Sequence, residues 1–153
     1  MSDIVDRETR SRMMSGIRGK DTKPELTVRG YLHRNGFRYV LHRPDLPGRP
    51  DLTFKGRNAV VFVHGCFWHA HMDCKLATIP SSRPEFWKKK LEGNRARDER
   101  QVQLLREAGW RVAIVWECSL KGAPDAALAG LSAFLESDCP YATFALNQVP
   151  RIE

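Results

Sequence analysis

No apolar stretch in this chain approaches the roughly 18 residues that a transmembrane helix requires. The first ten residues, MSDIVDRETR, are polar almost from the start, so the charged cap and apolar run of a secretory signal are absent as well. Cysteine is scarce, with four among 153 residues, and the cytosol keeps thiols reduced. We therefore expect no membrane partner, a cytoplasmic location, and cysteines that act as thiols or metal ligands and not as disulfides.

The length and the hydrophobic pattern predict a single α/β domain over residues 1–153. A chain of this size can bury a substantial core, and it contains no internal repeat. The predicted helices cover residues 6–17, 22–35, 82–108 and 125–135, and the third turns Phe86, Leu91, Val102 and Leu105 inward. The predicted strands cover residues 37–42, 51–54, 59–63 and 111–116. Because the last two strands are continuous apolar runs, we expect a central mixed sheet flanked by helices.

Positive charge is concentrated in two parts of the chain. The net charge is +7, with +5 on residues 1–50 and +4 on residues 83–111, whereas residues 112–153 carry −3. A polyanion such as nucleic acid suits both basic segments, and two solvated helix faces are the alternative. We expect residues 1–20 to form a mobile helical arm that contacts DNA, and residues 140–153 to form an irregular tail.

Metal-ligating residue types are crowded into the run HGCFWHAHMDC, which covers residues 64–74. This run and the segment after strand 111–116 supply four candidate ligands: Cys66, His71, Cys74 and Cys118. Three thiolates and one imidazole complete a tetrahedral structural zinc site with no open position. The alternative for any single cysteine is a small buried apolar residue, which is how we interpret Cys139.

Asp51 ends the segment LPGRPD, in which two prolines and a glycine precede a predicted strand. A carboxylate fixed there, facing a second strand that ends at His64, suits a hard cation such as Mg²⁺, and an ordinary Pro-Asp turn is the alternative. Pro-Asp, a hairpin and a buried strand are also the skeleton of the PD-(D/E)xK nuclease core. The second acid and the lysine of that motif are missing here, and Phe62-Val63-His64 stands in their place.

Four motifs extend this comparison: PGRPD, HGCFWHAH, EFWKKKLEGNRARD and GWRVAIVWEC. Together they resemble the very-short-patch-repair endonucleases, from Arg7 to about Leu120. The resemblance implies a restriction-endonuclease-like core with a structural zinc, and a Mg²⁺-dependent enzyme that nicks one strand of double-stranded DNA. The nick would lie beside a T·G mismatch left by deamination of 5-methylcytosine, at the bacterial nucleoid, with mismatch-repair proteins as candidate partners. A nick needs one active site, so we expect a monomer.

The resemblance also implies catalytic roles for particular residues. Asp51 would hold Mg²⁺ together with the backbone carbonyl of Val63. His69 would activate the attacking water or lie over the scissile phosphate, and Asp98 would orient it. His64 would support the network of metal-bound water. Histidine can accept a proton near neutral pH, and a carboxylate partner fixes its tautomer, which suits the role given to His69.

Other interpretations stay open for several of these side chains. Glu25 would lie in the outer shell of the Mg²⁺, although its place in a capping box with Thr22 explains it equally well. His64 at a strand end would otherwise be a satisfied core histidine. His33 and His42 are interpreted as surface or core residues without a role in the site.

The residues expected to bind DNA are apolar, aromatic, amide or basic: Met14, Phe67, Trp68, Trp87, Lys90 and Asn94. Aromatic rings beside cations suit a wedge that enters a base stack while phosphates are held outside it. By resemblance Met14 would wedge from the opposite groove, although an ordinary amphipathic-helix residue is the alternative. Lys90 and Asn94 would read base edges.

Two rival functions fit the same sequence. One is a zinc-stabilised DNA-binding module whose nuclease centre is inactive. The other is a restriction-type nuclease that cuts both strands. Cleavage of a duplex with one T·G mismatch, compared with a matched duplex, separates these two from the mismatch-dependent nicking enzyme.

Overall fold

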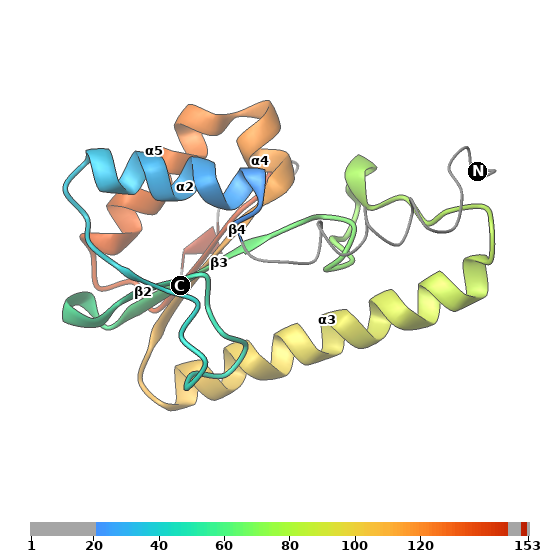
Figure 1. The fold of residues 1–153 in the computed structure, drawn as a ribbon, viewed down its shortest axis with the longest axis horizontal. Helices are drawn as coiled ribbons and strands as arrows, with labels where there is room; N and C mark the ends of the chain where they lie inside the picture. The colour runs from blue at the N-terminus through green and yellow to red at the C-terminus, as the bar shows by residue number, and fades with distance from the viewer. Residues whose placement is uncertain (1–20, 147–150, 153) are drawn as a thin grey trace.

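A mixed β-sheet forms the centre of the computed structural model, which describes residues 21–146 and 151–152 (Figure 1). Its six strands follow one another in chain order: β1 (Val40–Leu41), β2 (Leu52–Phe54), β3 (Ala59–His64), β4 (Arg111–Trp116), β5 (Tyr141–Phe144) and β6 (Arg151–Ile152). Strands β1, β2 and β3 pair antiparallel, β3, β4 and β5 pair parallel, and β6 returns antiparallel to β5. The expected α/β domain with a central mixed sheet is confirmed.

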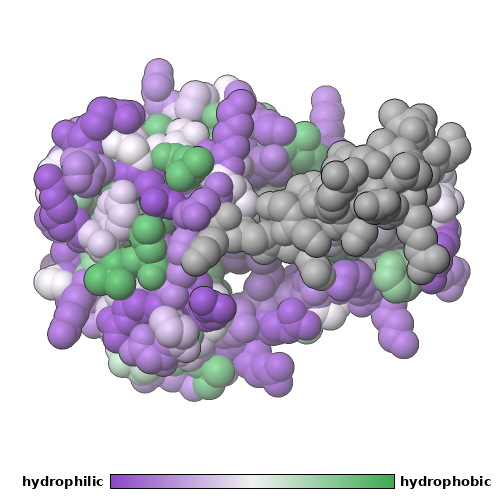
Figure 2. Space-filling view, viewed as in Figure 1, coloured by the Kyte–Doolittle hydropathy of each residue, from purple (hydrophilic) through white to green (hydrophobic). Residues whose placement is uncertain are grey.

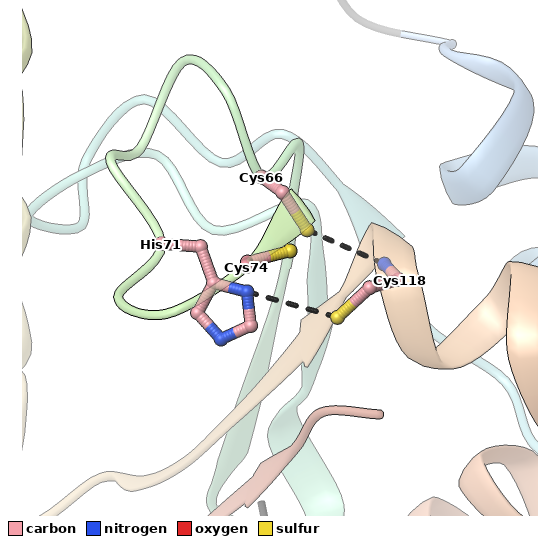
Figure 3. Close-up of side chains that lie close together, drawn as sticks. All are labelled: Cys66, His71, Cys74 and Cys118. Atoms are coloured by element: carbon pink, nitrogen blue, oxygen red, sulfur yellow. Dashed lines mark hydrogen bonds between the residues drawn. The ribbon is translucent and has the colours of Figure 1, made fainter. Parts of the chain in front are cut away.

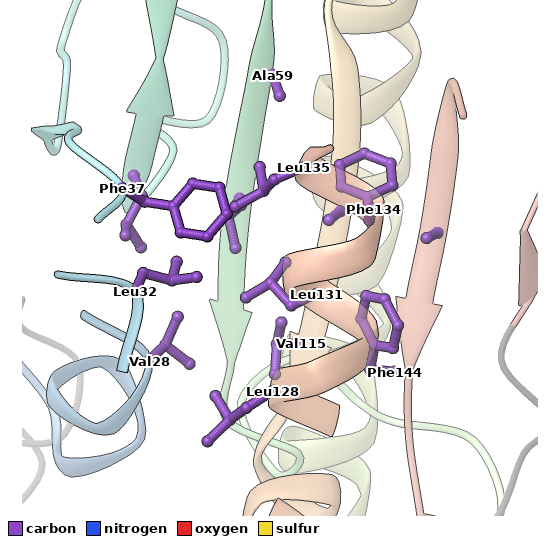
Figure 4. Packing of buried hydrophobic residues seen from close by; sticks show 14 of the residues in the cluster. Val28, Leu32, Phe37, Ala59, Val115, Leu128, Leu131, Phe134, Leu135 and Phe144 are labelled. Carbon is purple, nitrogen blue, oxygen red and sulfur yellow. The ribbon is translucent and has the colours of Figure 1, made fainter. Parts of the chain in front are cut away.

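Helices cover both faces of the sheet. They are α2 (Lys23–Arg34), α3 (Pro84–Glu107), α4 (Glu117–Gly122) and α5 (Pro124–Leu135), with short 3₁₀ turns at Lys55–Arg57 and Lys75–Ala77. Side chains alternate between the two faces of a strand, so Val61 of β3 packs under α2 and α5, whereas Val60 packs under α3. Figure 4 shows the larger core, in which α5 contributes Leu128, Leu131 and Phe134. Within the described residues no helix is both long enough and apolar enough to cross a bilayer.

The pairing of β3 with β4 determines where the site lies. The register aligns the two strands along their whole length and ends with His64 beside Trp116. Both strands were expected from their apolar runs, and both are buried along most of their length. Because parallel strands end at the same edge of a sheet, the segments that follow them meet there. The loop after β3 and the first turn of α4 are therefore neighbours.

Helix α3 is longer than the sheet that it covers. Its 24 residues span about 36 Å at 1.5 Å per residue, and Figure 1 shows its N-terminal part running beyond the sheet alongside the loop after β3. Hydrophilic side chains follow this helix on the face shown in Figure 2. Leu91 and Leu105 are buried and Val102 is partly buried, as expected, but Phe86 is 45% exposed. The expectation for Phe86 is wrong because, among the described residues, neither hydrophobic core includes this end of the helix.

Several sequence expectations need correction at the ends of elements. Residues 140–153 were expected to be an irregular tail, but Tyr141–Phe144 forms β5 and buries Ala142 and Phe144. Four residues give too short an alternation to identify, and the strand exists because β4 offers a free edge. The strand expected at 37–42 is reduced to Val40–Leu41. The helix expected at 6–17 and the arm at 1–20 lie outside the described residues.

Candidate functional site

A groove of about 1090 Å³ opens at the ends of β3 and β4, between α2, the loop after β3 and the outer part of α3. It is lined by almost every residue expected in the catalytic and DNA-binding sites: Glu25, Asp51, Val63, His64, Phe67, Trp68, His69, Trp87, Lys90, Asn94 and Asp98. Met14 lies outside the described residues. Side chains from four separate segments are thus gathered on one surface, and the sheet topology is what brings them together.

Asp51 lies just before β2 and faces the end of β3. The backbone N–H of Val63 donates to Asp51 Oδ2 at 2.7 Å, which fixes the carboxylate beside that strand. In an antiparallel pair the N–H and C=O of one residue point to the same partner strand. The Val63 carbonyl therefore points to the side on which Asp51 lies. A carboxylate and a carbonyl oxygen on one side of a strand form a donor set suited to a hard cation.

The carboxylate of Glu25 is buried against the same end of the groove, with only 2% of the residue exposed. Thr22 caps the helix, since its Oγ1 accepts from the Glu25 N–H at 3.4 Å. The carboxylate itself accepts from Arg29 Nη1 at 3.2 Å and from the Asp21 N–H at 3.3 Å. Half of the expected capping box is therefore present, and the side chain of Glu25 has other partners.

His42 connects the two acids, which the sequence did not indicate. Its Nε2 lies 2.9 Å from Glu25 Oε2 and 3.9 Å from Asp51 Oδ1. His42 reaches this place from a loop in which its own φ is +49°, an unusual conformation for a residue with a side chain. No sequence signal marks a left-handed conformation at histidine, so the contact could be found only from the structure.

The two carboxylates make an ionised Asp51 unfavourable in the absence of a cation. Burial raises the pKa of Asp51 from 3.8 to about 7, and the charge of Glu25 adds to that rise. The hydrogen bond from the Val63 N–H opposes the rise without cancelling it. A bound divalent cation would remove this penalty, so the charge distribution fits a metal at Asp51.

His69 and Asp98 form the second polar pair of the groove. Nδ1 of His69 lies 2.5 Å from Asp98 Oδ2 on α3, which leaves Nε2 as the second nitrogen of the ring. The ring of His64 stacks on that of His69, with 3.8 Å between centroids and 3° between planes. His69 is therefore held by a carboxylate at one nitrogen and by a flat ring against its face.

His64 is buried, with 4% exposed, but it is not the satisfied core histidine of the alternative interpretation. Its Nδ1 is buried and has no hydrogen-bond partner within the described residues. Burial lowers its pKa well below the ordinary value, and the charges of His69 and His71 lower it further. His64 thus presents a neutral ring to His69.

The four expected metal ligands come together beside the groove (Figure 3). One ligand atom from each of Cys66, His71, Cys74 and Cys118 lies within 4.8 Å of the other three. The backbone N–H of Cys118 donates to Cys66 Sγ at 3.3 Å, and that of Leu146 donates to Cys118 Sγ at 3.5 Å.

The chemistry of this cluster fits a structural metal. All four cysteines of the chain, including Cys139, are free thiols. Burial raises the pKa of the Cys66 and Cys118 thiols, so thiolates in this place need a cation as partner. Backbone N–H donors to sulfur stabilise thiolates in the same way. With four ligands and no open position, the cluster has the composition of a closed site.

An aromatic cluster forms the outer wall of the groove. Phe67 packs against Trp68 and Trp87 with centroid distances of 5.0 Å and 5.5 Å, and Phe86 rests on Trp87 at 5.3 Å. Asn94 Nδ2 donates to the Trp68 carbonyl at 2.9 Å, so this amide fixes the loop that carries the aromatic rings. Arg95, which the sequence did not single out, fixes the same loop through the carbonyl of Ala70 at 2.8 Å.

Basic side chains line much of the remaining surface of the groove: Lys23, Arg49, Arg83, Lys90, Arg97 and Lys121. Lys90 and Arg97 belong to α3, and Arg49 belongs to the segment that leads into Asp51. This arrangement of basic side chains around a small acidic centre suits a nucleic acid. The basic side chains would hold its phosphate backbone at the rim, while one phosphate group enters the acidic centre. The two basic segments of the sequence therefore contribute to one groove.

Comparison with known proteins gives consistent matches along most of the chain. A family model for the DNA mismatch endonuclease Vsr matches residues 2–76. The DNA mismatch endonuclease Vsr of Escherichia coli is 43% identical over 122 residues, which cover 80% of this chain and 78% of the relative. The type II nicking enzyme V.XorIIP of Xanthomonas oryzae is 50% identical over 120 residues, which cover 78% and 88%. The type II nicking enzyme V.NmeAIP of Neisseria meningitidis is 41% identical over 121 residues, which cover 79% and 86%.

Proposed function

The chain belongs to the Vsr family of DNA mismatch endonucleases, and we propose that it nicks one strand of a DNA duplex beside a T·G mismatch, thereby initiating very short patch repair. The observation that carries this proposal is the composition of the groove. A carboxylate pair, a histidine–aspartate pair, a cluster of aromatic rings and a basic rim share one surface. These are the parts that hydrolysis of a phosphodiester within a distorted duplex requires.

In the proposed reaction the His69–Asp98 pair prepares the attacking water. Asp98 holds the proton on Nδ1, so Nε2 of His69 is left to accept a proton from the water. The stacked ring of His64 prevents His69 from tilting away from that position. A fixed base of this kind contributes typically 10²- to 10⁴-fold to the rate.

Asp51 and the carbonyl of Val63 would hold Mg²⁺ at the scissile phosphate, with Glu25 in the outer shell. When bound, Mg²⁺ stabilises the charge that develops on the phosphate oxygens. The buried carboxylates fit this ion, since burial raises the pKa of Asp51 to about 7 and the charge of Glu25 adds to that rise, a penalty that a divalent cation would remove. Zinc is the metal proposed for the cluster of Cys66, His71, Cys74 and Cys118, because thiolates and imidazole select it.

The aromatic cluster and the basic rim would bind the duplex. Phe67, Trp68 and Trp87 pack edge to face, so the cluster has the rigidity of a wedge that opens a base stack. A T·G pair stacks and pairs less well than a matched pair, which makes it the easiest place for such a wedge to enter. Lys90 and Asn94 lie in the same groove and are proposed to contact base edges, although the Asn94 amide also holds the Trp68 loop.

The decisive experiment uses a pool of duplexes that carry one T·G mismatch flanked by random base pairs, with a matched T·A pool as control. Incubation with Mg²⁺ followed by sequencing of the ends shows where each strand is cut. A nick on one strand of the T·G pool alone supports the proposal. Binding without any cut would instead support an inactive DNA-binding module, and cuts in both strands would support a restriction-type nuclease.

A second candidate is a strand-specific nicking enzyme that needs a defined sequence and no mismatch. It is favoured by the names of two relatives, which are described as type II nicking enzymes. The same pools separate the candidates. A mismatch-dependent enzyme cuts only the T·G pool, whereas this alternative cuts one strand of the T·A pool at a subset of flanking sequences.

The His69–Asp98 pair gives a graded prediction. Replacing His69 by glutamine is expected to lower kcat on the T·G duplex by about 10²- to 10⁴-fold, because the base is lost. Replacing Asp98 by asparagine is expected to lower kcat by about 10- to 100-fold, because His69 remains but is no longer oriented. Single-turnover nicking at saturating enzyme measures both effects.

Glu99→Gln is the matched control for Asp98→Asn. Glu99 is the next residue of α3, is exposed, and does not line the groove. Its replacement is expected to leave kcat unchanged. If Asp98→Asn behaved like Glu99→Gln, Asp98 would have no part in the reaction.

A further inference from the structure

Trp116 ends β4 at the point where the metal cluster and the groove meet. It is the register partner of His64 on β3, and Cys118 of the metal cluster follows two residues later. Its indole is partly buried against the core beneath α3. Trp116 does not line the groove; it lines a separate cavity of about 670 Å³ together with His69 and Asp98.

A continuous series of ring contacts passes through Trp116. The ring of His71 stacks on the indole, with 4.0 Å between centroids and 7° between planes. The indole meets the ring of His64 edge to face at 5.1 Å. His64 stacks in turn on His69, whose Nδ1 lies 2.5 Å from Asp98. One ligand of the metal cluster is thereby connected to the histidine–aspartate pair through two intervening rings.

His64 depends on these neighbours for its position. Its Nδ1 has no hydrogen-bond partner within the described residues, and its ring packs between Phe62 at 5.5 Å, Trp116 and His69. Aromatic contacts of this kind have preferred geometries, so they orient a ring as well as bury it. Removing the indole would leave His64 with space on one side, and His69 would lose a firm surface to stack on.

We propose that Trp116 is a positioning residue that transmits the geometry of the metal cluster to His64 and His69. The proposal rests on the proposed function for the part that His69 plays. As a ligand of the bound metal, His71 would be held in one orientation. Its ring stacks on the indole and so restrains it, and the indole in turn restrains the ring of His64. A displacement of about 1 Å at a catalytic group can cost about 100-fold in rate, so a ring that acts at a distance can affect catalysis strongly.

The test compares Trp116→Ala, Trp116→Phe and the control Trp110→Ala in the metal-loaded protein. Trp110 precedes β4 at its opposite end and packs, partly buried, against the same core. Trp116→Ala is expected to lower kcat by about 10- to 100-fold, with KM on the T·G duplex within about twofold and one metal still bound. Trp116→Phe should stay within about threefold of wild type, because a smaller ring still stacks. Trp110→Ala should leave kcat unchanged.

A readout that does not need cleavage keeps this inference separate from the proposed function. The chain has five histidines, so NMR signals of the His64 and His69 imidazoles can be assigned by single replacements. Trp116→Ala is expected to shift or broaden both signals, and Trp110→Ala is expected to leave them unchanged. If the wild type failed to nick DNA, the proposed function would be wrong, and the imidazole signals would still decide the inference.

His71→Cys provides the second test, because it keeps a thiolate ligand for the metal and removes the ring that stacks on Trp116. We expect the metal to remain bound and kcat to fall. Combined with Trp116→Ala, the two losses should be less than multiplicative, since both changes interrupt one series of contacts. Multiplicative losses, or unchanged imidazole signals in Trp116→Ala with metal bound, would overturn the proposal.

Discussion

Asp51→Asn is expected to abolish nicking while leaving the fold intact. If the carboxylate holds the catalytic Mg²⁺, its loss removes about 4 kcal/mol of transition-state stabilisation, which corresponds to about 1,000-fold in kcat. Asparagine has nearly the same shape and can still accept the hydrogen bond from the Val63 N–H. Single-turnover nicking of the T·G duplex over a range of Mg²⁺ concentrations measures the effect, and high Mg²⁺ should restore little of it.

The same substitution is expected to raise the stability of the metal-free protein at neutral pH. The pKa of Asp51 is raised in the folded state from 3.8 to about 7, so the folded protein holds this proton more tightly than the unfolded chain does. The contribution of Asp51 to the free energy of unfolding is therefore fully present below pH 3.8 and is lost as the pH rises through about 7. Asparagine removes the ionised form, and the melting temperature at pH 8 without Mg²⁺ should increase.

Asp45→Asn is the matched control for both measurements. Asp45 lies in the segment between β1 and β2, is exposed, and pairs with Arg43 at 3.0 Å. Its replacement should change neither nicking nor the melting temperature appreciably, because exposed ion pairs contribute little. If the Asp51→Asn and Asp45→Asn variants nicked DNA equally well, Asp51 would have no catalytic role. It would then be an ordinary Pro-Asp turn residue, which is the alternative interpretation of the sequence.

The parts of the fold that could be predicted are those in which the local pattern and the tertiary environment agree. The runs at β3 and β4 are apolar at successive positions because both faces of those strands are covered, and the pattern therefore identified them. The metal cluster was recognisable for a different reason. Cysteine and histidine at close spacing have few uses other than ligation, and the parallel pairing of β3 and β4 brings Cys118 to the loop.

The missed features depend on tertiary contacts that leave no local pattern. His42 reaches Glu25 and Asp51 from the segment between β1 and β2, which has positive φ at His42 and Arg49, and one histidine or arginine in a sequence is not enough to predict that rare conformation. Phe86 has the helical spacing of a core residue, yet it belongs to the first turn of α3, whose N-terminal part runs beyond the sheet (Figure 1), and it is 45% exposed. Trp116 lies in a predicted strand; its contact with His64 follows from the register of β3 and β4, whereas its contact with His71 depends on the path of the loop after β3.

The second large effect is expected on removing the metal from the cluster of Cys66, His71, Cys74 and Cys118. When a metal binds only the folded state and its free concentration is 1,000 times the dissociation constant, binding raises the free energy of unfolding by about 4 kcal/mol. For a domain of this size about 2–4 °C of melting temperature corresponds to each kcal/mol, so chelation should lower the melting temperature by roughly 8–16 °C. Calorimetry of the protein with and without a strong chelator measures this, and mass spectrometry should find one tightly bound metal, which we expect to be zinc.

Cys118→Ser should reproduce most of that loss, because it removes one of the four ligands and leaves the other three around a poorly held ion. Cys139→Ser is its matched control, since Cys139 is a free thiol beside the core and lies outside the cluster. Its replacement is expected to cost about 1 kcal/mol or less, through the partly buried sulfur alone. Equal losses in the two variants would mean that Cys118 is only a buried thiol.

The loop between Cys66 and Cys74 explains why the metal should matter for nicking as well as for stability. Ala70 and Asp73 both have positive φ, near +51° and +52°, and such conformations cost of order 1 kcal/mol each for residues other than glycine. A short loop that contains strained residues is expected to change conformation when the metal that holds its two ends is removed. His69 lies inside this loop, so chelation should abolish nicking even at temperatures where the sheet and its two cores remain folded. Retention of nicking after complete removal of the metal would contradict the structural role proposed for it.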